Sequence, residues 1–192
     1  MRHLSPWPAL FALLFALGTP AQARLGGDFT LTDHDGAPFS LEQARGQVVL
    51  LFFGYTHCPD ICLTTLGEVT AALHRLGELA DRVQPLFVSV DPERDTPAVL
   101  RNYVGWFDPR ITALTGSPDA IRAVADQYRV RYSFGPREAS GFYPVDHSAD
   151  LYVIDTDGRL VRKLPYGIPP ETIAETVRTL LRRADAPAAA HR

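Results

Sequence analysis

This chain lacks several features that would assign it to a class of protein at once. It has only two cysteines among 192 residues, and its formal net charge of −3 comes with no basic stripe, which argues against a nucleic-acid partner. No apolar run reaches the ~20 residues that span a bilayer, and there is no internal repeat or interdomain linker. What remains, with 46% hydrophobic residues, is the composition of one globular domain with a substantial core.

The first 23 residues have the pattern of a targeting segment. A basic start is followed by an apolar run over 9–17 and by Ala21-Gln22-Ala23, the three parts of a secretory signal peptide. We therefore expect residues 1–23 to be a signal peptide, with an uncleaved membrane anchor as the alternative. No cysteine lies near position 23, which excludes a lipid anchor on an N-terminal cysteine. The protein is expected on the periplasmic side, soluble or anchored to the cytoplasmic membrane.

Hydrophobic patterning after this segment alternates between strands and helices. Residues 131–147 show no period and are predicted as a loop. Residues 24–184 are predicted as one α/β domain with a mixed, helix-covered sheet and an N-terminal β-hairpin, and 185–192 as a disordered tail. The predicted strands are 28–31, 38–41, 48–53, 85–90, 111–116 and two within 151–164, and the predicted helices are 62–79, 97–107, 118–130 and 169–184.

The two cysteines lie in GYTHCPDICLTT (54–65), separated by three residues. A structural disulfide is the first interpretation for an exported protein, but so small a loop would remove little entropy from the unfolded chain. Cys58 follows a buried strand, and Pro59 could begin a helix whose dipole would favour the Cys58 thiolate. If Cys62 lies one helical turn away, the two Cβ atoms are ~5–6 Å apart. That spacing suits two thiolates on one soft metal ion at least as well as a disulfide.

Two thiolates do not complete a metal site, so the histidines are candidates for a third ligand. Four of the six lie in the signal, the tail or polar surface positions: His3, His191, His34 and His74. His57 adjoins Cys58 and could lower its pKa, but adjacent side chains diverge. His147 stands in a polar Asp146-His147-Ser148 set before a predicted strand. Such a segment returns beside the first strand-to-helix junction of an α/β sheet, although a surface histidine is the alternative.

Cys58, Cys62 and His147 would form a soft ligand set of low coordination number. Such a set suits Cu(I) and, after oxidation, Cu(II), at about one ion per chain. Zinc is the competing metal, but a structural zinc site usually has four protein ligands. We therefore favour copper.

Three motifs in order resemble the signatures of the Sco/SenC copper chaperones: THCPDIC (56–62), DPERDT (91–96) and DHS (146–148). The resemblance extends over nearly the whole mature chain. It implies a thioredoxin-like fold, with copper bound by Cys58, Cys62 and His147. It also implies copper delivery to, or thiol reduction of, the copper-A centre of a haem–copper cytochrome oxidase during assembly. The implied partner is the copper-A-bearing subunit or another copper chaperone, with membrane proximity through that partner or an uncleaved N-terminus.

The resemblance also suggests supporting residues and contains one departure. In such a family Asp91 would lie near the metal, so Asp91, Asp146 and His57 are candidates for supporting the ligands or contacting a partner. Capping and turn formation are the roles expected of Asp95. The family usually has proline directly after the second cysteine, where this chain has Leu63. This change removes no ligand, but it frees a backbone N–H. The redox potential and the partner surface of the family therefore carry over to this chain less safely.

Two other functions share the same thiols. A general extracytoplasmic thiol–disulfide oxidoreductase would use Cys58 and Cys62 as a redox-active pair. It would normally have two residues between its cysteines and a proline immediately before the later strand, whereas Pro144 stands further back. A thiol peroxidase would have threonine three positions before its cysteine, where this chain has Tyr55. We therefore expect a copper chaperone rather than an enzyme, with thiol–disulfide reduction as a side activity.

Overall fold

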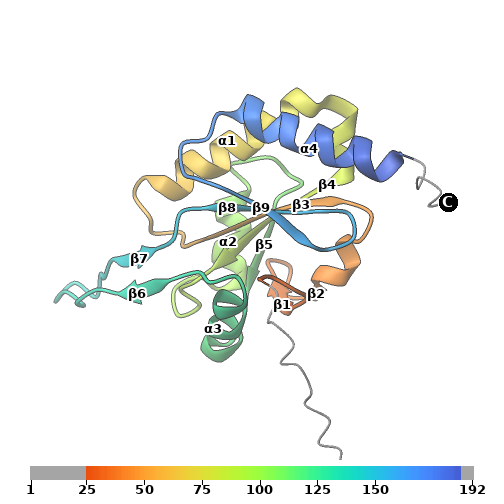
Figure 1. The fold of residues 1–192 in the computed structure, drawn as a ribbon. Helices are drawn as coiled ribbons and strands as arrows, with labels where there is room; N and C mark the ends of the chain where they lie inside the picture. The colour runs from red at the N-terminus through yellow and green to blue at the C-terminus, as the bar shows by residue number, and fades with distance from the viewer. Residues whose placement is uncertain (1–24, 187–192) are drawn as a thin grey trace, which may run out of the picture.

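A mixed β-sheet lies at the centre of the protein (Figure 1). The computed structural model describes residues 25–186, so the expected signal peptide and most of the expected tail lie outside the described residues. Within them the seven sheet strands are β1 (Thr30–Asp33), β2 (Pro38–Ser40), β3 (Val48–Gly54), β4 (Val83–Ser89), β5 (Thr112–Thr115), β8 (Leu151–Ile154) and β9 (Leu160–Leu164). Their order is β2-β1-β5-β4-β3-β8-β9, with β3, β4 and β5 parallel and the outer pairs antiparallel. The predicted mixed sheet and N-terminal hairpin are confirmed.

Helices cover both faces of this sheet. They are α1 (Ile61–Leu76), α2 (Pro97–Val104), α3 (Pro118–Gln127) and α4 (Pro170–Asp185), with 3₁₀ turns η1 (Leu41–Ala44) and η2 (Gly77–Arg82). Helices α1 and α4 lie together on one side of the sheet and α3 on the other (Figure 1). The Thr96 and Ser117 side chains each accept a hydrogen bond from the backbone N–H three residues later. These N-caps, each followed by proline, begin α2 and α3 where the sequence predicts.

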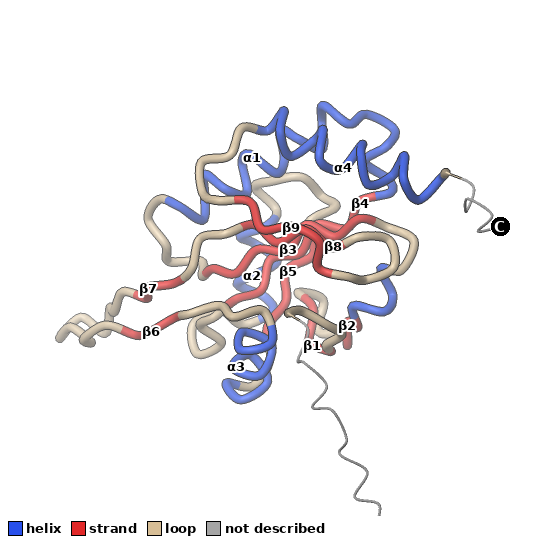
Figure 2. Tube along the Cα trace, in the orientation of Figure 1, coloured by secondary structure: helices blue, strands red, loops and turns tan. Residues whose placement is uncertain are grey.

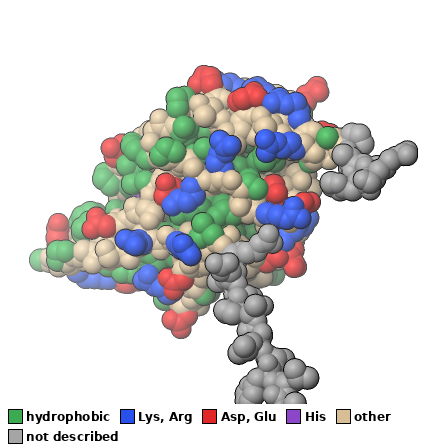
Figure 3. Space-filling view, viewed as in Figure 1, with side chains coloured by type: hydrophobic (Ala, Val, Ile, Leu, Met, Phe, Trp, Pro, Cys, Tyr) green, Lys and Arg blue, Asp and Glu red, His purple; other side chains and the backbone are tan. Residues whose placement is uncertain are grey.

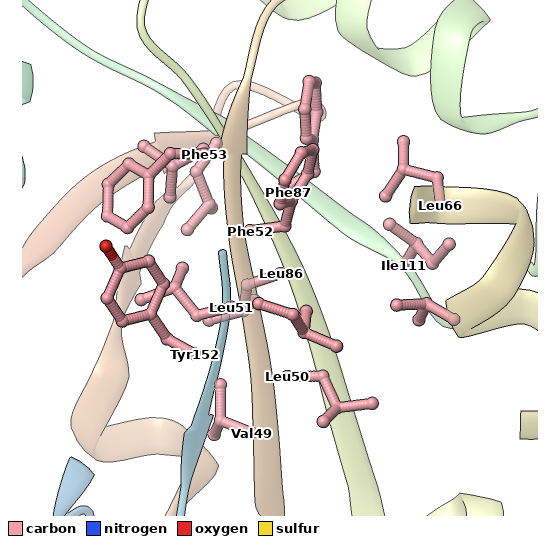
Figure 4. Close-up of a cluster of buried hydrophobic side chains, with 14 of the residues drawn as sticks. Val49, Leu50, Leu51, Phe52, Phe53, Leu66, Leu86, Phe87, Ile111 and Tyr152 are labelled. Atoms are coloured by element: carbon pink, nitrogen blue, oxygen red, sulfur yellow. The ribbon is translucent and has the colours of Figure 1, made fainter. Parts of the chain in front are cut away.

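The core is organised by alternation along β3, which is buried at every position. Phe52 packs against Phe87 of β4 with ring centroids 6.2 Å apart, on the α1 side of the sheet (Figure 4). The next residue, Phe53, points to the opposite side and contacts Tyr152 (Figure 4). Because side chains alternate along a strand, position 54 faces the same side as Phe52. Gly54 therefore ends β3 on the face that carries α1.

The region predicted as a loop contains two short strands. β6 (Tyr132–Phe134) and β7 (Val145–His147) pair antiparallel as a separate ribbon, which projects from the sheet (Figure 2). We call residues 132–147, both strands and the loop between them, the ribbon. Each strand has three residues, too few to produce a visible alternation in the sequence, so the prediction of a featureless loop was wrong here.

Some predicted helix ends also differ from the structure. Helix α1 begins at Ile61, two residues after Pro59, and stops at Leu76 because Gly77 has a φ of 59° and leaves the helical region. Helices α2 and α3 end a few residues earlier than predicted, at Val104 and Gln127. Asp185, predicted in the tail, is the last residue of α4.

Among residues 25–186, no helix combines the length and the apolar character that crossing a bilayer requires. On the face shown in Figure 3, acidic and basic side chains are interspersed, and no single charge dominates this face.

Candidate metal centre

Three potential metal ligands from separate parts of the chain meet at one end of β3. Cys58 comes from the loop after β3, Cys62 from the first turn of α1, and His147 from the last position of β7. Their ligand atoms all lie within 4.8 Å of one another. The Cys62 Sγ is 3.5 Å from the His147 Nε2. Ligands bound to one ion at ~2.0–2.3 Å are separated by at most ~4–4.6 Å, so small shifts bring all three onto a shared metal.

The two thiols differ in exposure and in charge. Both are free; Cys62 is fully buried and Cys58 is 6% exposed. A hydrogen bond from the Cys62 side chain, with another from the Asp60 backbone, holds the pKa of Cys58 well below its usual range. Hydrogen bonding to Cys58 and burial raise the pKa of Cys62. These directions favour the thiolate at Cys58 and the thiol at Cys62, so metal binding to both sulfur atoms would release the Cys62 proton.

The imidazole of His147 is held in the orientation that a metal ligand needs. Its Nδ1 lies 2.9 Å from the Ser148 carbonyl oxygen. A carbonyl only accepts, so Nδ1 carries the proton and Nε2 keeps a free lone pair toward Cys62. The rings of Phe52 and Tyr55 pack edge-on against the imidazole, at centroid distances of 6.1 and 5.7 Å. The Tyr55 hydroxyl also accepts a hydrogen bond from the Val145 backbone N–H, which joins the cysteine loop to β7.

A buried carboxylate fastens the loop that carries Cys58. Asp95 has no exposed surface, and its carboxylate accepts hydrogen bonds from the Thr56 N–H, the Thr56 hydroxyl and the Ser89 hydroxyl, at 3.0, 2.6 and 2.6 Å. Burial raises the pKa of Asp95, and the hydrogen bonds from Ser89 and Thr56 oppose that rise. The sequence predicts only capping and turn formation for Asp95, because nothing in its spacing shows that it meets Thr56.

A second buried carboxylate ties the ribbon to the sheet. Asp91 has no exposed surface, forms an ion pair with Arg94 Nε, and accepts a hydrogen bond from the Tyr143 hydroxyl at 2.9 Å. Arg94 also donates to the Tyr143 carbonyl, and its guanidinium lies 3.6 Å from the centre of the Tyr143 ring. Asp91 is thus joined to the ribbon that carries His147; the family resemblance suggested a place near the metal and gave no sign of Tyr143.

The other residues singled out from the sequence lie around the centre rather than in it. Asp146 is exposed, and it lines a hollow of about 300 Å³ together with Cys58, Ile61 and His147. His57 is exposed, with its Nδ1 3.1 Å from the Thr56 hydroxyl, and it is not among the three grouped ligand residues. Asp146 thus has the accessibility that a partner contact requires.

Two further histidines among the described residues, and the departure from the family pattern, have structural explanations. His34 accepts a hydrogen bond from the Ala113 N–H, and the exposed His74 lies 3.6 Å from the Asp108 carboxylate. Leu63 is 46% exposed in the first turn of α1. An N–H in that turn has no partner within the helix, so leucine and proline are both compatible with the backbone. The change alters an exposed position in the first turn of α1 and leaves the ligand set intact.

Comparison with known proteins gives matches over most of the chain. The SCO1/SenC family model matches residues 18–182. The chain is 42% identical over 160 residues to the mitochondrial SCO2 homolog of Mus musculus, covering 82% of this chain and 63% of the mouse protein. It thus spans less than two thirds of that relative.

Solved structures give the same result. The copper-bound ScoI of Bradyrhizobium japonicum is 43% identical, with a TM-score of 0.76 over 82% of this chain and 99% of that one. Copper-bound yeast Sco1 is 33% identical, with a TM-score of 0.76 over 86% of this chain and 97% of that one. Copper is therefore bound in two structures that share this fold. The chain belongs to the SCO1/SenC family.

Proposed function

We propose that this protein binds one copper ion through Cys58, Cys62 and His147 and delivers it during assembly of a cytochrome oxidase. The observation that carries the proposal is the convergence of two sulfur atoms and one unprotonated imidazole nitrogen within 4.8 Å. Soft thiolates with one imidazole favour Cu(I). Copper-bound structures of the same family support the choice of metal.

The unequal exposure of the cysteines gives the transfer a direction. Cys58 and His147 line the hollow, and Cys62 lies behind them without exposed surface. An incoming acceptor thiolate therefore reaches the ion from the Cys58 side. A bond from copper to the acceptor sulfur forms as the bond to Cys58 breaks, and copper stays Cu(I) throughout. The proposed acceptor is the copper-A centre, or another copper chaperone, on the periplasmic side of the membrane.

Metal analysis of protein purified with reduced thiols tests this proposal. We expect about one Cu(I) per chain in the wild type, and loss of most bound copper in Cys58→Ser and Cys62→Ser. His147→Ala should bind at least tenfold more weakly and lose the wild-type Cu(II)–thiolate absorption band. His74→Ala, which changes an exposed histidine away from the ligand group, is the matched control. Equal affinity and an unchanged band in His147→Ala would refute the three-ligand site.

The free thiols also favour a second function, reduction of the acceptor's disulfide. Cys58 Sγ would attack one sulfur of that disulfide, form a mixed disulfide and release one acceptor thiolate. Cys62 would then lose its proton and attack Cys58 Sγ, which releases the second thiolate and leaves a Cys58–Cys62 disulfide. Two electrons pass to the acceptor. If this were the main activity, the protein would reduce unrelated disulfides and His147→Ala would remain active; we expect neither.

A further inference from the structure

The last residue of β3 leaves a space that the Cys62 sulfur fills. A Cβ atom at position 54 would stand 2.6 Å from Cys62 Sγ, 2.9 Å from a ring carbon of Phe87 and 3.2 Å from a ring carbon of Phe52. Contacts between carbon and other heavy atoms are normally ~3.5–4 Å. Glycine at this position therefore makes a notch at the end of a strand whose other side chains fill the core.

The reason for glycine here is space and not backbone conformation. Gly54 is absent from the glycines with positive φ, so its backbone suits any residue. The strand cannot easily move aside, because the Gly54 carbonyl accepts a hydrogen bond from Val90 N–H at 2.8 Å, and Gly54 is paired with Ser89 in the parallel register. A side chain at position 54 would have to displace its neighbours instead.

The sulfur in this notch is confined from the other side as well. Cys62 is fully buried, α1 fixes its backbone, and His147 Nε2 lies 3.5 Å from its Sγ. We infer that Gly54 is a positioning residue of the metal centre: its missing side chain sets the depth of the Cys62 sulfur and thus its distance from His147 and Cys58. This inference rests on the proposed copper site and names a residue that touches a ligand without binding the ion.

The displacement that alanine would cause is large on the scale of a metal site. Bringing the Cβ–Sγ distance from 2.6 Å to the 3.4 Å of an ordinary contact moves the sulfur by roughly 0.8 Å if it moves alone. Metal–ligand distances tolerate ~0.2 Å. Gly54→Ala should therefore weaken copper binding while leaving all three ligands in the chain.

Copper affinity and the absorption spectrum give the first test. We expect Gly54→Ala to bind Cu(I) at least tenfold more weakly, by competition with a chromophoric chelator, and to shift the Cu(II)–thiolate band. Gly67→Ala is the control, because Gly67 is exposed in α1 and a Cβ there meets nothing within 4 Å. Gly67→Ala should match the wild type in both measurements. Wild-type affinity with an unchanged band in Gly54→Ala would overturn the inference.

A thermal unfolding cycle without metal separates this inference from the proposed function. Gly54→Ala should lower the melting temperature of the reduced apo protein, and most of that loss should disappear in a Cys62→Ala background, where the sulfur is gone. An equal loss in both backgrounds would assign the collision to Phe87 and overturn the inference. If Gly54→Ala alone does not fold, folding of the double variant supports the notch and its failure to fold refutes it. Failure of the wild type to bind copper would refute the proposed function and leave this cycle unaffected.

Discussion

At the scale of single residues, the cysteine loop depends on a carboxylate 37 residues after Cys58. Asp95 accepts three hydrogen bonds, two from the half-buried Thr56 and one from Ser89, and both Asp95 and Ser89 have no exposed surface. A buried donor that loses its acceptor destabilises the folded state, because water does not reach it to replace the hydrogen bond. The conformation of the loop is thus set from outside the loop.

Asp95→Ala is expected to destabilise the apo protein by about 2–4 kcal/mol, because it leaves the Thr56 and Ser89 donors unpaired. Urea unfolding of the reduced protein measures this loss. We also expect weaker Cu(I) binding, since Thr56 lies two residues before Cys58. Asp126→Ala, at an exposed position of α3, serves as the control and should change the free energy of unfolding by less than ~0.5 kcal/mol. A loss of similar size in both variants would contradict the anchoring role.

At the scale of elements, the ligand residues belong to parts of the structure that differ in how they are held. Cys62 lies on a helix packed into the core, whereas His147 ends a two-stranded ribbon outside the main sheet (Figure 2). The ribbon is tied down through Tyr143, whose hydroxyl donates to Asp91 and whose ring lies under Arg94. Burial, followed by the contact with Asp91, raises the pKa of Tyr143 to about 12, so the hydroxyl remains protonated at neutral pH.

Removing the Tyr143 hydroxyl should loosen the ribbon, while the phenyl ring left at position 143 still fills the same space. Tyr143→Phe leaves the buried Asp91 one hydrogen bond short, which costs ~1–3 kcal/mol at that group. We expect amide hydrogen exchange over residues 132–147 to speed up several-fold while exchange in β3 and β4 stays at the wild-type rate.

Tyr132→Phe on the same ribbon provides the comparison for this measurement, because its ring packs under Arg122 and its hydroxyl is not bonded to Asp91. It should leave the exchange rates close to wild type. Unchanged exchange in Tyr143→Phe would mean that the ribbon is held by other contacts.

At the scale of the whole molecule, a bound ion would join the stretch that carries Cys58 and Cys62 to the ribbon that carries His147. A ligand that binds only the folded state stabilises it by mass action, ~4 kcal/mol at a free concentration of 1,000 Kd. Cu(I) should therefore raise the melting temperature of the reduced wild type. It should do so far less for His147→Ala.

Oxidation provides an internal control for this prediction. A Cys58–Cys62 disulfide uses both sulfur atoms, so the oxidised protein should show no copper-dependent rise in melting temperature and should contain no copper after dialysis. The thiols should recover their copper binding after reduction. Copper retained by cleanly oxidised protein would contradict the assignment of both thiolates as ligands.

Sequence reasoning reached the fold and the three grouped residues because those signals are local. The buried run over 48–53, the cysteine spacing and the polar set around His147 can each be recognised within a short segment. The contacts that support the centre are not local: Thr56 meets Asp95 across 39 residues and Asp91 meets Tyr143 across 52. No spacing rule links such pairs. The three-residue strands of the ribbon were likewise too short to predict, and the expected signal peptide stays a prediction.

The complete burial of Cys62 limits how partner proteins can reach the metal centre. The hollow is lined by Cys58 and His147 but not by Cys62, so a copper donor and a copper acceptor would both approach the ion through this hollow. Copper uptake and copper release would then use the same surface, so two partners could not contact the ion at the same time. The protein would therefore bind its copper donor and its copper acceptor in turn rather than both at once. If the protein delivers copper as proposed, the bond to Cys62 would be the last to break.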